Sequence, residues 1–225
     1  MKPTKMILIF IKDPSSGCVK NRLKPVLSEP FIQQLYHVFI KDIITMIELL
    51  DVKFRFCFYP DDAEKNIKSF LGNNYEYMSQ IGMDLGERME NAFISCFNEG
   101  YREIILIGSD LPDLPVEIIQ ESFQALKTND GVIGPATDGG YYLIGFTKDG
   151  FCPSIFYDMN WSTKTVFNDT IKILESNEKT TVILPSFNDI DTFDDLIDFY
   201  KRNKRSAFKK ARTMTFLEKH KDIFK

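Results

Sequence analysis

The sequence predicts an α/β protein with a single domain, built as a three-layer sandwich around a mainly parallel central sheet. Two observations carry this prediction. Short apolar runs typical of buried strands alternate with segments of helical periodicity through the first 130 residues. The chain also has 225 residues, of which 44% are hydrophobic and 20 are phenylalanine, enough to form one sizeable core.

The individual elements follow from local patterns. Residues 6–11 form the first apolar run, and Ser28 with Pro30 is expected to open the first helix, which continues to residue 50. Asp84, Ser162 or Thr163, and Thr192 are expected to cap three of the later helices. Further strands are expected at residues 53–59, 75–81, 104–107, 132–133, 141–146 and 181–184. Further helices are expected at residues 61–71, 84–100, 116–127, 163–175 and 192–199.

The segment 104–115 provides the strongest indication of a site. Its four leading apolar residues predict a strand buried on both faces, and Gly108 then lets the backbone turn. Asp110 therefore follows a strand end. Ligands of open α/β sheets bind in the crevice outside the carboxyl ends of the strands, where an acid can hold a metal ion against a phosphate.

The loop after the first strand, residues 13–25, is rich in turn formers and cations. Gly17 supplies a turn, and Lys20, Arg22 and Lys24 alternate behind it. This composition fits an anion-binding loop and an ordinary solvated basic loop equally well. The spacing of a Walker loop is absent.

Three further places carry polar or aromatic candidates. Asp138 with its two following glycines predicts a hairpin turn, or a backbone that approaches a ligand on the rim that holds Asp110. Arg88 lies in the first two turns of a helix and can reach a phosphate, whereas capping alone explains the acids beside it. Trp161 is either a core residue or a platform for a sugar or base.

Asp191 is the remaining acid for which helix capping does not account. It lies in the loop before Thr192, the expected helix cap, together with Asp189. The acids at 194 and 195 fall in the first helical turn, where carboxylates complement the helix dipole.

The composition excludes several classes of site. The four cysteines lie far apart with no zinc spacing, so free thiols are expected, and two histidines form no nucleophilic triad. The apolar runs are far shorter than the roughly 20 residues of a membrane span, and the start of the chain does not resemble a secretion signal, so we expect a cytoplasmic protein.

The charge is unevenly distributed along the chain. The net charge of −4 combines +8 over residues 201–225 with −12 over the rest. We therefore divide the chain into a domain at residues 1–203 and a basic, partly helical, solvated tail at residues 204–225. No nucleic-acid-binding module accompanies the basic segment, so nucleic acid is not the expected partner.

Six motifs in register resemble a known family: FIKDPSSGCVKNRL, MDLGERM, GSDLPDLP, DGGYYLIG, WSTKTV and DIDTFDDL. They resemble the uncharacterised glycosyltransferase-like proteins of bacteria and archaea, which have the nucleotide-diphospho-sugar transferase (GT-A) fold. Phospholactate guanylyltransferase and the molybdenum-cofactor nucleotidyltransferase share that fold more distantly. Two positions depart from the family pattern: Asn21 replaces the usual threonine, and Phe193 replaces proline.

The resemblance implies a metal-dependent transferase that uses a nucleotide-activated donor and Mg²⁺ or Mn²⁺. The first expectation is glycosyl transfer from a nucleotide sugar to a small-molecule acceptor. The alternative is nucleotidyl transfer from a nucleoside triphosphate. The second alternative is a non-catalytic nucleotide-binding protein. The resemblance implies that Asp110, Asp138 and Lys20 take part in catalysis and that Asp110 and Asp191 bind the metal. The residues implied for nucleotide binding are Gly17, Lys20, Arg22, Arg88, Ser109 and Asp110. Those implied for the acceptor side are Asp138, Gly139, Gly140 and Trp161.

Overall fold

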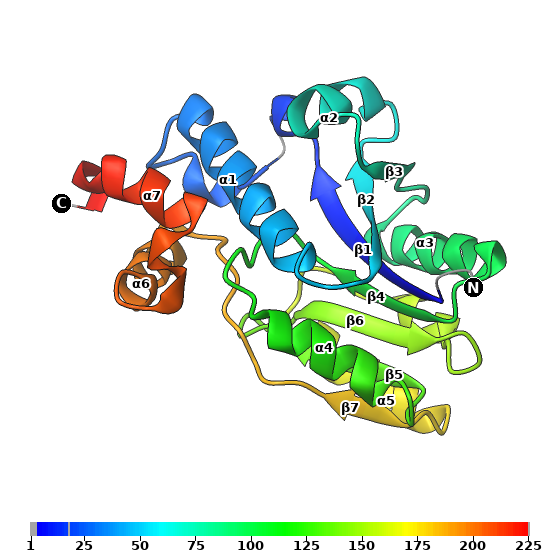
Figure 1. Cartoon of the computed structure of the whole chain (residues 1–225). Coiled ribbons are helices and arrows are strands. Elements are labelled where there is room, and N and C mark those ends of the chain that lie inside the picture. The colour runs from blue at the N-terminus through cyan, green and yellow to red at the C-terminus, as the bar shows by residue number, and fades with distance from the viewer. Residues whose placement is uncertain (1–3, 18, 225) are drawn as a thin grey trace.

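The computed structural model describes residues 4–17 and 19–224. Its centre is a seven-stranded sheet of order β3-β2-β1-β4-β6-β5-β7, with helices on both faces (Figure 1). β6 runs antiparallel to its neighbours β4 and β5, and the other paired strands are parallel. The predicted α/β sandwich with a mainly parallel sheet is confirmed.

All seven expected strands are present, with bounds within a few residues of those expected. They are β1 (Lys5–Lys12), β2 (Lys53–Tyr59), β3 (Glu76–Ser79), β4 (Glu103–Ile107), β5 (Gly131–Pro135), β6 (Tyr141–Thr147) and β7 (Thr181–Ile183). The α-helices are α1 (Glu29–Ile47), α2 (Glu64–Leu71), α3 (Leu85–Glu99), α4 (Val116–Ala125), α5 (Val166–Ser176), α6 (Phe193–Asn203) and α7 (Arg212–Lys219).

The core has two halves, one on each face of the sheet. Along β1, Ile7 and Ile9 pack toward α1 and α4, whereas Met6 and Leu8 pack toward α3 and α5. All four are fully buried. Alternate residues of a central strand point to opposite faces, which is why the strand appears in the sequence as one continuous apolar run.

The expected cap positions are confirmed at three of four places, and a capping hydrogen bond forms at two of them. The Asp84 carboxylate accepts a hydrogen bond from the backbone of Glu87, and Thr192 forms a capping box with Asp195. Ser28 lies at the cap position of α1 but makes no capping bond. One of the backbone donors that such a cap uses is missing there, because the second helical residue is a proline.

The cap expected at Ser162 or Thr163 is wrong. α5 begins at Val166, and Thr165 occupies its cap position. Ser162 has a left-handed backbone (φ +67°), and the Thr163 hydroxyl donates to the carbonyl of Asn160. These local turns delay the start of the helix by three residues.

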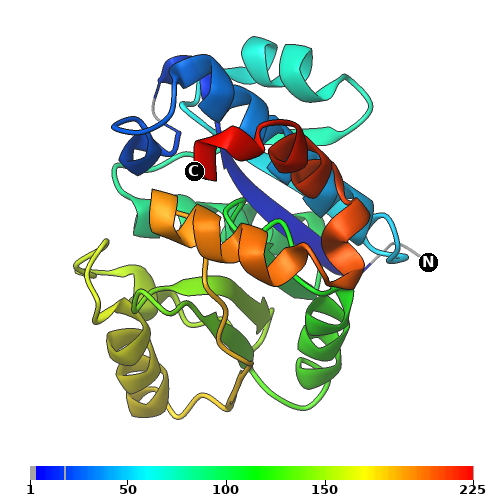
Figure 2. The same ribbon diagram turned by 90° about the vertical axis from the view of Figure 1, so that its left-hand side faces the viewer.

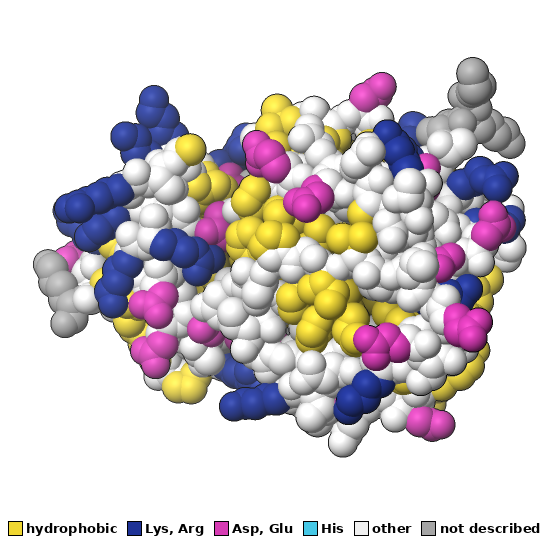
Figure 3. All heavy atoms as spheres, turned by 90° about the horizontal axis from the view of Figure 1, so that it is seen from below, with side chains coloured by type: hydrophobic (Ala, Val, Ile, Leu, Met, Phe, Trp, Pro, Cys, Tyr) yellow, Lys and Arg dark blue, Asp and Glu magenta, His cyan; other side chains and the backbone are white. Residues whose placement is uncertain are grey.

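The basic C-terminal segment is folded against the domain. Figure 2 shows α7 (red) lying across α1, and Met214 and Leu217 are buried in the same core half as α1. The carboxylate of Asp42, itself 5% exposed, accepts hydrogen bonds from the backbone nitrogens of Arg212 (3.0 Å) and Thr213 (2.7 Å). The boundary expected at residue 203 therefore does not mark the end of the packed structure, although basic side chains do gather at this end (Figure 3).

Two further observations concern membrane spans and cysteines. In the part of the chain that the structure describes, no helix combines the length and apolarity needed to cross a bilayer. Cys57, Cys96 and Cys152 are buried free thiols, as expected, and Cys18 lies outside the described residues.

Candidate functional site

The candidate site is a cleft of about 480 Å³ at the carboxyl edge of the sheet. The connections that follow β1, β3, β4, β5 and β7 all contribute to its walls. Parallel strands end at the same edge, so these distant segments meet there. The expected site residues that line the cleft are Lys20, Arg22, Arg88, Ser109, Asp110, Asp138, Gly140, Trp161 and Asp191.

Lys20 lies at the centre of the charged part of the cleft. Its ammonium group is 2.6 Å from Oδ1 of Asp110 and 3.3 Å from Oδ1 of Asp191, and it also donates to the carbonyl of Ile190. The side chain is 3% exposed. Burial lowers the pKa of Lys20, but the two carboxylates outweigh burial and raise it overall, so the ammonium stays charged.

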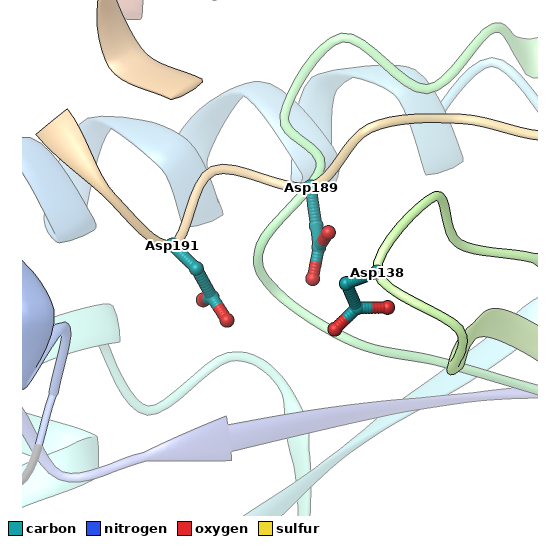
Figure 4. A group of neighbouring side chains, drawn as sticks. All are labelled: Asp138, Asp189 and Asp191. Carbon is teal, nitrogen blue, oxygen red and sulfur yellow. The ribbon is translucent and has the colours of Figure 1, made fainter. Parts of the chain in front are cut away.

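Three acids form a second, overlapping group. Among the described residues, the carboxylate oxygens of Asp138, Asp189 and Asp191 come within 4.8 Å of one another. Figure 4 shows them directed toward a common space, from the turn between β5 and β6 and from the loop between β7 and α6. The metal pair expected from the sequence, Asp110 and Asp191, is bridged by the Lys20 ammonium.

Asp189 is the site residue that the sequence analysis did not assign. Burial, followed by the charges of Asp191, Asp138 and Asp110, raises the pKa of Asp189 to about 7. Its position two residues before Asp191 was the available signal, because alternate residues of an extended segment point the same way. Its burial and its proximity to Asp138 depend on tertiary packing, which the sequence pattern does not reveal.

The donor set fits a hard divalent cation. Mg²⁺ prefers carboxylate oxygens at about 2.0–2.1 Å, so ligands on opposite sides of it lie about 4.2 Å apart, and oxygens within 4.8 Å need only small side-chain rotations to reach it. A cation there would also relieve the mutual repulsion that raises the pKa of Asp189.

The loops that carry the acids are tied together behind the cleft. Asp113, after β4, accepts hydrogen bonds from Arg202 (3.0 Å) and Asn203 (2.6 Å) at the end of α6. The backbone nitrogen of Ile190 also donates to the carbonyl of Asp110 at 3.0 Å. We call these contacts the β4–α6 brace. It fixes the loop of Asp110 relative to the loop of Asp191.

The two arginines of the cleft are held differently. Arg22 is 66% exposed, and the contact recorded for it is a 3.6 Å approach to Asp191. The guanidinium of Arg88 stacks 3.8 Å from the centre of the Tyr59 ring, and its Nε donates to the carbonyl of Gly82 at 3.2 Å. Arg22 is thus free to turn toward a ligand, whereas Arg88 is oriented in advance.

Ser109 belongs to a buried hydroxyl network. Its Oγ is 2.8 Å from the hydroxyl of Tyr36, which accepts a 3.0 Å hydrogen bond from the backbone nitrogen of Lys12. Burial, followed by the charge of Asp110, raises the pKa of Tyr36, so its hydroxyl stays protonated. Neither Tyr36 nor this link was expected from the sequence.

Backbone conformation, close packing and backbone hydrogen bonds mainly explain the glycines expected at the site. Gly17 (φ +66°) ends the short turn after β1, accepts a hydrogen bond from the Lys24 ammonium at 2.6 Å, and lies outside the lining of the cleft. Gly139 (φ +98°) also lies outside the lining, and a Cβ there would come within 2.2 Å of the Lys164 carbonyl oxygen. Gly140 lines the cleft and donates its backbone N–H to Asp138 at 2.9 Å.

Trp161 forms part of the apolar wall. Its indole packs against Gly86, where a Cβ would come within 2.8 Å of the ring, and meets Tyr141 edge-to-face. Its indole nitrogen is buried and has no hydrogen-bond partner among the residues that the structure describes. Trp161 is therefore a packing residue that also lines the cleft, and its role as a platform for a sugar or base stays a prediction.

The chain matches one family model. Residues 43–163 fit the family described as "Uncharacterized protein conserved in bacteria (DUF2064)". The chain belongs to this family. No functionally curated protein matches the chain.

Solved structures extend the comparison. A protein of Desulfovibrio desulfuricans G20, provisionally described as a nucleotide-diphospho-sugar transferase, is 37% identical, with a TM-score of 0.94 over 98% of this chain and 96% of that one. The likeness confirms the nucleotide-diphospho-sugar transferase fold expected from the motifs.

Two distant structures support the fold alone. A 4-diphosphocytidyl-2C-methyl-D-erythritol synthase of Anaerococcus prevotii is 13% identical, with a TM-score of 0.59 over 90% of this chain and 100% of that one. A Mycobacterium tuberculosis H37Rv protein in complex with manganese is 10% identical, with a TM-score of 0.53 over 89% of this chain and 100% of that one.

Proposed function

We propose that the chain is a metal-dependent transferase that uses a nucleotide-activated donor, and that it transfers a glycosyl group from a nucleotide sugar to a small-molecule acceptor. The observation that carries this proposal is the pair Asp110 and Asp191 around the Lys20 ammonium, with Asp138 and Asp189 grouped beside Asp191, at the edge of the sheet where ligands of such folds bind. Helix capping and core packing need none of these five side chains in that arrangement.

The acids and the cations of the cleft would contribute to diphosphate binding in different ways. Asp138, Asp189 and Asp191 would hold Mg²⁺ or Mn²⁺, which neutralises charge on the leaving diphosphate when bound. Arg22 and Arg88 face the same cleft and supply charge-assisted hydrogen bonds to phosphate oxygens. Catalysis on this basis consists of positioning and charge neutralisation.

Names of relatives support the reaction class. The 37% identical protein is provisionally described as a nucleotide-diphospho-sugar transferase, and the erythritol synthase name describes a diphosphocytidyl product. A manganese complex in a third protein of this fold supports the choice of a divalent ion.

The engagement of Lys20 favours glycosyl over nucleotidyl transfer. An ammonium group has three N–H donors, and Lys20 has three oxygen partners within the protein. Arg22 and Arg88 then remain as the expected phosphate contacts, a number that suits a diphosphate.

Nucleotidyl transfer from a nucleoside triphosphate remains the second candidate. The exposed side chain of Arg22 favours it, since a loop with a free cation can close over additional phosphates. A non-catalytic nucleotide-binding protein would share the binding behaviour of both transferases but form no product.

A thermal-shift panel with Mn²⁺ separates these functions. It compares nucleotide sugars, nucleoside diphosphates and nucleoside triphosphates, because a ligand at 100 times its dissociation constant stabilises by about 2.7 kcal/mol. We expect shifts with nucleotide sugars and diphosphates, lost in Asp189→Asn and kept in Asp194→Asn, an exposed acid of α6 outside the cluster.

A turnover assay follows with the ligands that bind. Release of free nucleoside diphosphate from a nucleotide sugar supports glycosyl transfer. Shifts with triphosphates alone, together with release of pyrophosphate, would replace it with nucleotidyl transfer. No shift with any nucleotide would contradict both transferase functions.

A further inference from the structure

The expected partner of Lys20 was a nucleotide phosphate, but its partners within the protein are carboxylates. The ammonium contacts Asp110 at 2.6 Å and Asp191 at 3.3 Å, and the carbonyl of Ile190 takes its third donor. The ring of Phe39 lies on another side, with its centre 6.0 Å from the nitrogen. An ammonium with every donor used and almost no exposed surface is not available to a second set of ligands.

The backbone also commits Lys20 to this position. Its φ of +48° places it in the left-handed region, which is uncommon for a residue with a side chain. The short turn Asn21–Leu23 follows directly, and Leu23 is fully buried in the core. The side chain is thus directed inward by a fixed backbone.

The geometry divides the carboxylates into two sets that share Asp191. Asp110 and Asp191 surround the ammonium, whereas Asp138, Asp189 and Asp191 surround the space where a divalent ion fits. Without Lys20, Asp110 and Asp191 would be a pair of acids across an empty space, which is the arrangement that attracts a second cation.

We propose that the Lys20 ammonium is a resident cation that occupies the Asp110–Asp191 part of the cluster, so that the site binds a single divalent ion on Asp138, Asp189 and Asp191. Lys20 is then a positioning residue: it keeps Asp191 turned toward the ion and prevents a second ion from binding. Asp110 anchors Lys20 and is not a metal ligand. This inference rests on the metal dependence of the proposed function.

The test counts Mn²⁺ ions per chain in the absence of nucleotide, by electron paramagnetic resonance of the free ion during a titration. We expect one ion on the wild type and two on Lys20→Met, which keeps an unbranched but slightly shorter side chain and removes its charge. The double variant Lys20→Met with Asp110→Asn should return to one ion, because it also removes the vacated acid. Lys24→Met, the same change in the same loop at a residue bonded to Gly17, should keep one ion.

The outcomes separate this inference from the proposed function. One ion on Lys20→Met, with the circular dichroism of a folded chain, or two ions on the wild type, would overturn the inference alone. No Mn²⁺ on the wild type would overturn the metal dependence of the proposed function and this inference with it.

A single substitution covers the case in which Lys20→Met does not fold. Asp110→Asn in the wild-type background should change the Mn²⁺ dissociation constant by less than about threefold. A loss of tenfold or more would make Asp110 a direct ligand and would overturn the inference.

Discussion

The carboxylate of Asp42, in the middle of α1, lies 2.7 Å from the backbone nitrogen of Thr213, in the first turn of α7. A residue 171 positions away in sequence thus performs the task of a helix cap. Asp42 and Thr213 are both buried, so the N–H group of Thr213 has no access to water that could replace the carboxylate.

The first prediction concerns this cap. Asp42→Ala should lower the free energy of unfolding by about 1–3 kcal/mol, because it leaves the buried backbone donor of Thr213 without a partner and removes the bond to Arg212. Urea denaturation measures the change. Asp51→Ala, which removes an exposed acid, is the matched control and should stay within about 0.5 kcal/mol of the wild type. Equal stability of the two variants would mean that α7 docks without the cap.

The second prediction concerns the pH dependence of stability in metal-free protein. The folded pKa of Asp189 is about 7, above the ordinary value of 3.8 for an aspartate, so the native state holds this proton more tightly than the unfolded chain. The stability from this group is therefore complete below about pH 4 and is lost as the pH rises toward and through 7.

Asp189→Asn should remove that dependence. In the presence of a chelator, the variant should gain at least about 1 kcal/mol in stability relative to wild type between pH 5 and pH 8, the value of a single unit of pKa shift. Urea denaturation at the two pH values measures it, and Asp194→Asn is the control. If the free energy of unfolding changed equally between the two pH values in wild type and Asp189→Asn, Asp189 would not be held among other acids.

The third prediction concerns Arg22. Because its side chain is largely exposed and its one recorded ion pair is 3.6 Å long, Arg22→Gln should leave the melting temperature nearly unchanged. It should weaken nucleoside diphosphate binding about tenfold, or 1.4 kcal/mol, through loss of a charge-assisted contact. Calorimetric titration tests this, with Arg205→Gln as an exposed control. A destabilised variant with unchanged affinity would assign Arg22 to the fold instead.

The fourth prediction uses the only tryptophan of the chain. In Gly86→Ala, the new methyl group would lie 2.4 Å from the carbonyl oxygen of Phe156 and 2.8 Å from the Trp161 ring. The indole must move, so the emission spectrum of Trp161 should shift and stability should fall by about 1–3 kcal/mol. Gly108→Ala, where a Cβ meets nothing within 4 Å, should leave the spectrum unchanged. An unshifted spectrum in Gly86→Ala would show that the indole does not rest on α3.

The fold could be predicted from sequence because its signals are local. The buried run of β4, the capping aspartate of α3 and the capping box of α6 each lie within a few residues of the element they define. The convergence of Asp110, Asp138 and Asp191 was also predictable, because each follows a strand whose end lies at the same edge of the sheet.

Side-chain pairing across the chain could not be predicted. The contact of Lys20 with Asp191 spans 171 positions, and the charges that act on Asp189 include those of Asp138, Asp110 and Lys20, which come from three other loops. A partly helical C-terminal segment was expected, but its packing against the domain was not, for a related reason. The apolar pair Met214 and Leu217 is surrounded by lysines and arginines, so the charge of the segment concealed its buried face.

The β4–α6 brace bears on the affinity of the proposed metal site for its divalent ion. Asp113, Arg202 and Asn203 tie together loops that carry like charges, so the repulsion among the acids is opposed by folding before any ion arrives. An ion that enters such a preorganised site does not lose affinity to ordering its own ligands. If the proposed metal site binds its ion on these acids, loosening the brace would weaken the affinity for the ion, because the loops would have to be ordered when the ion binds.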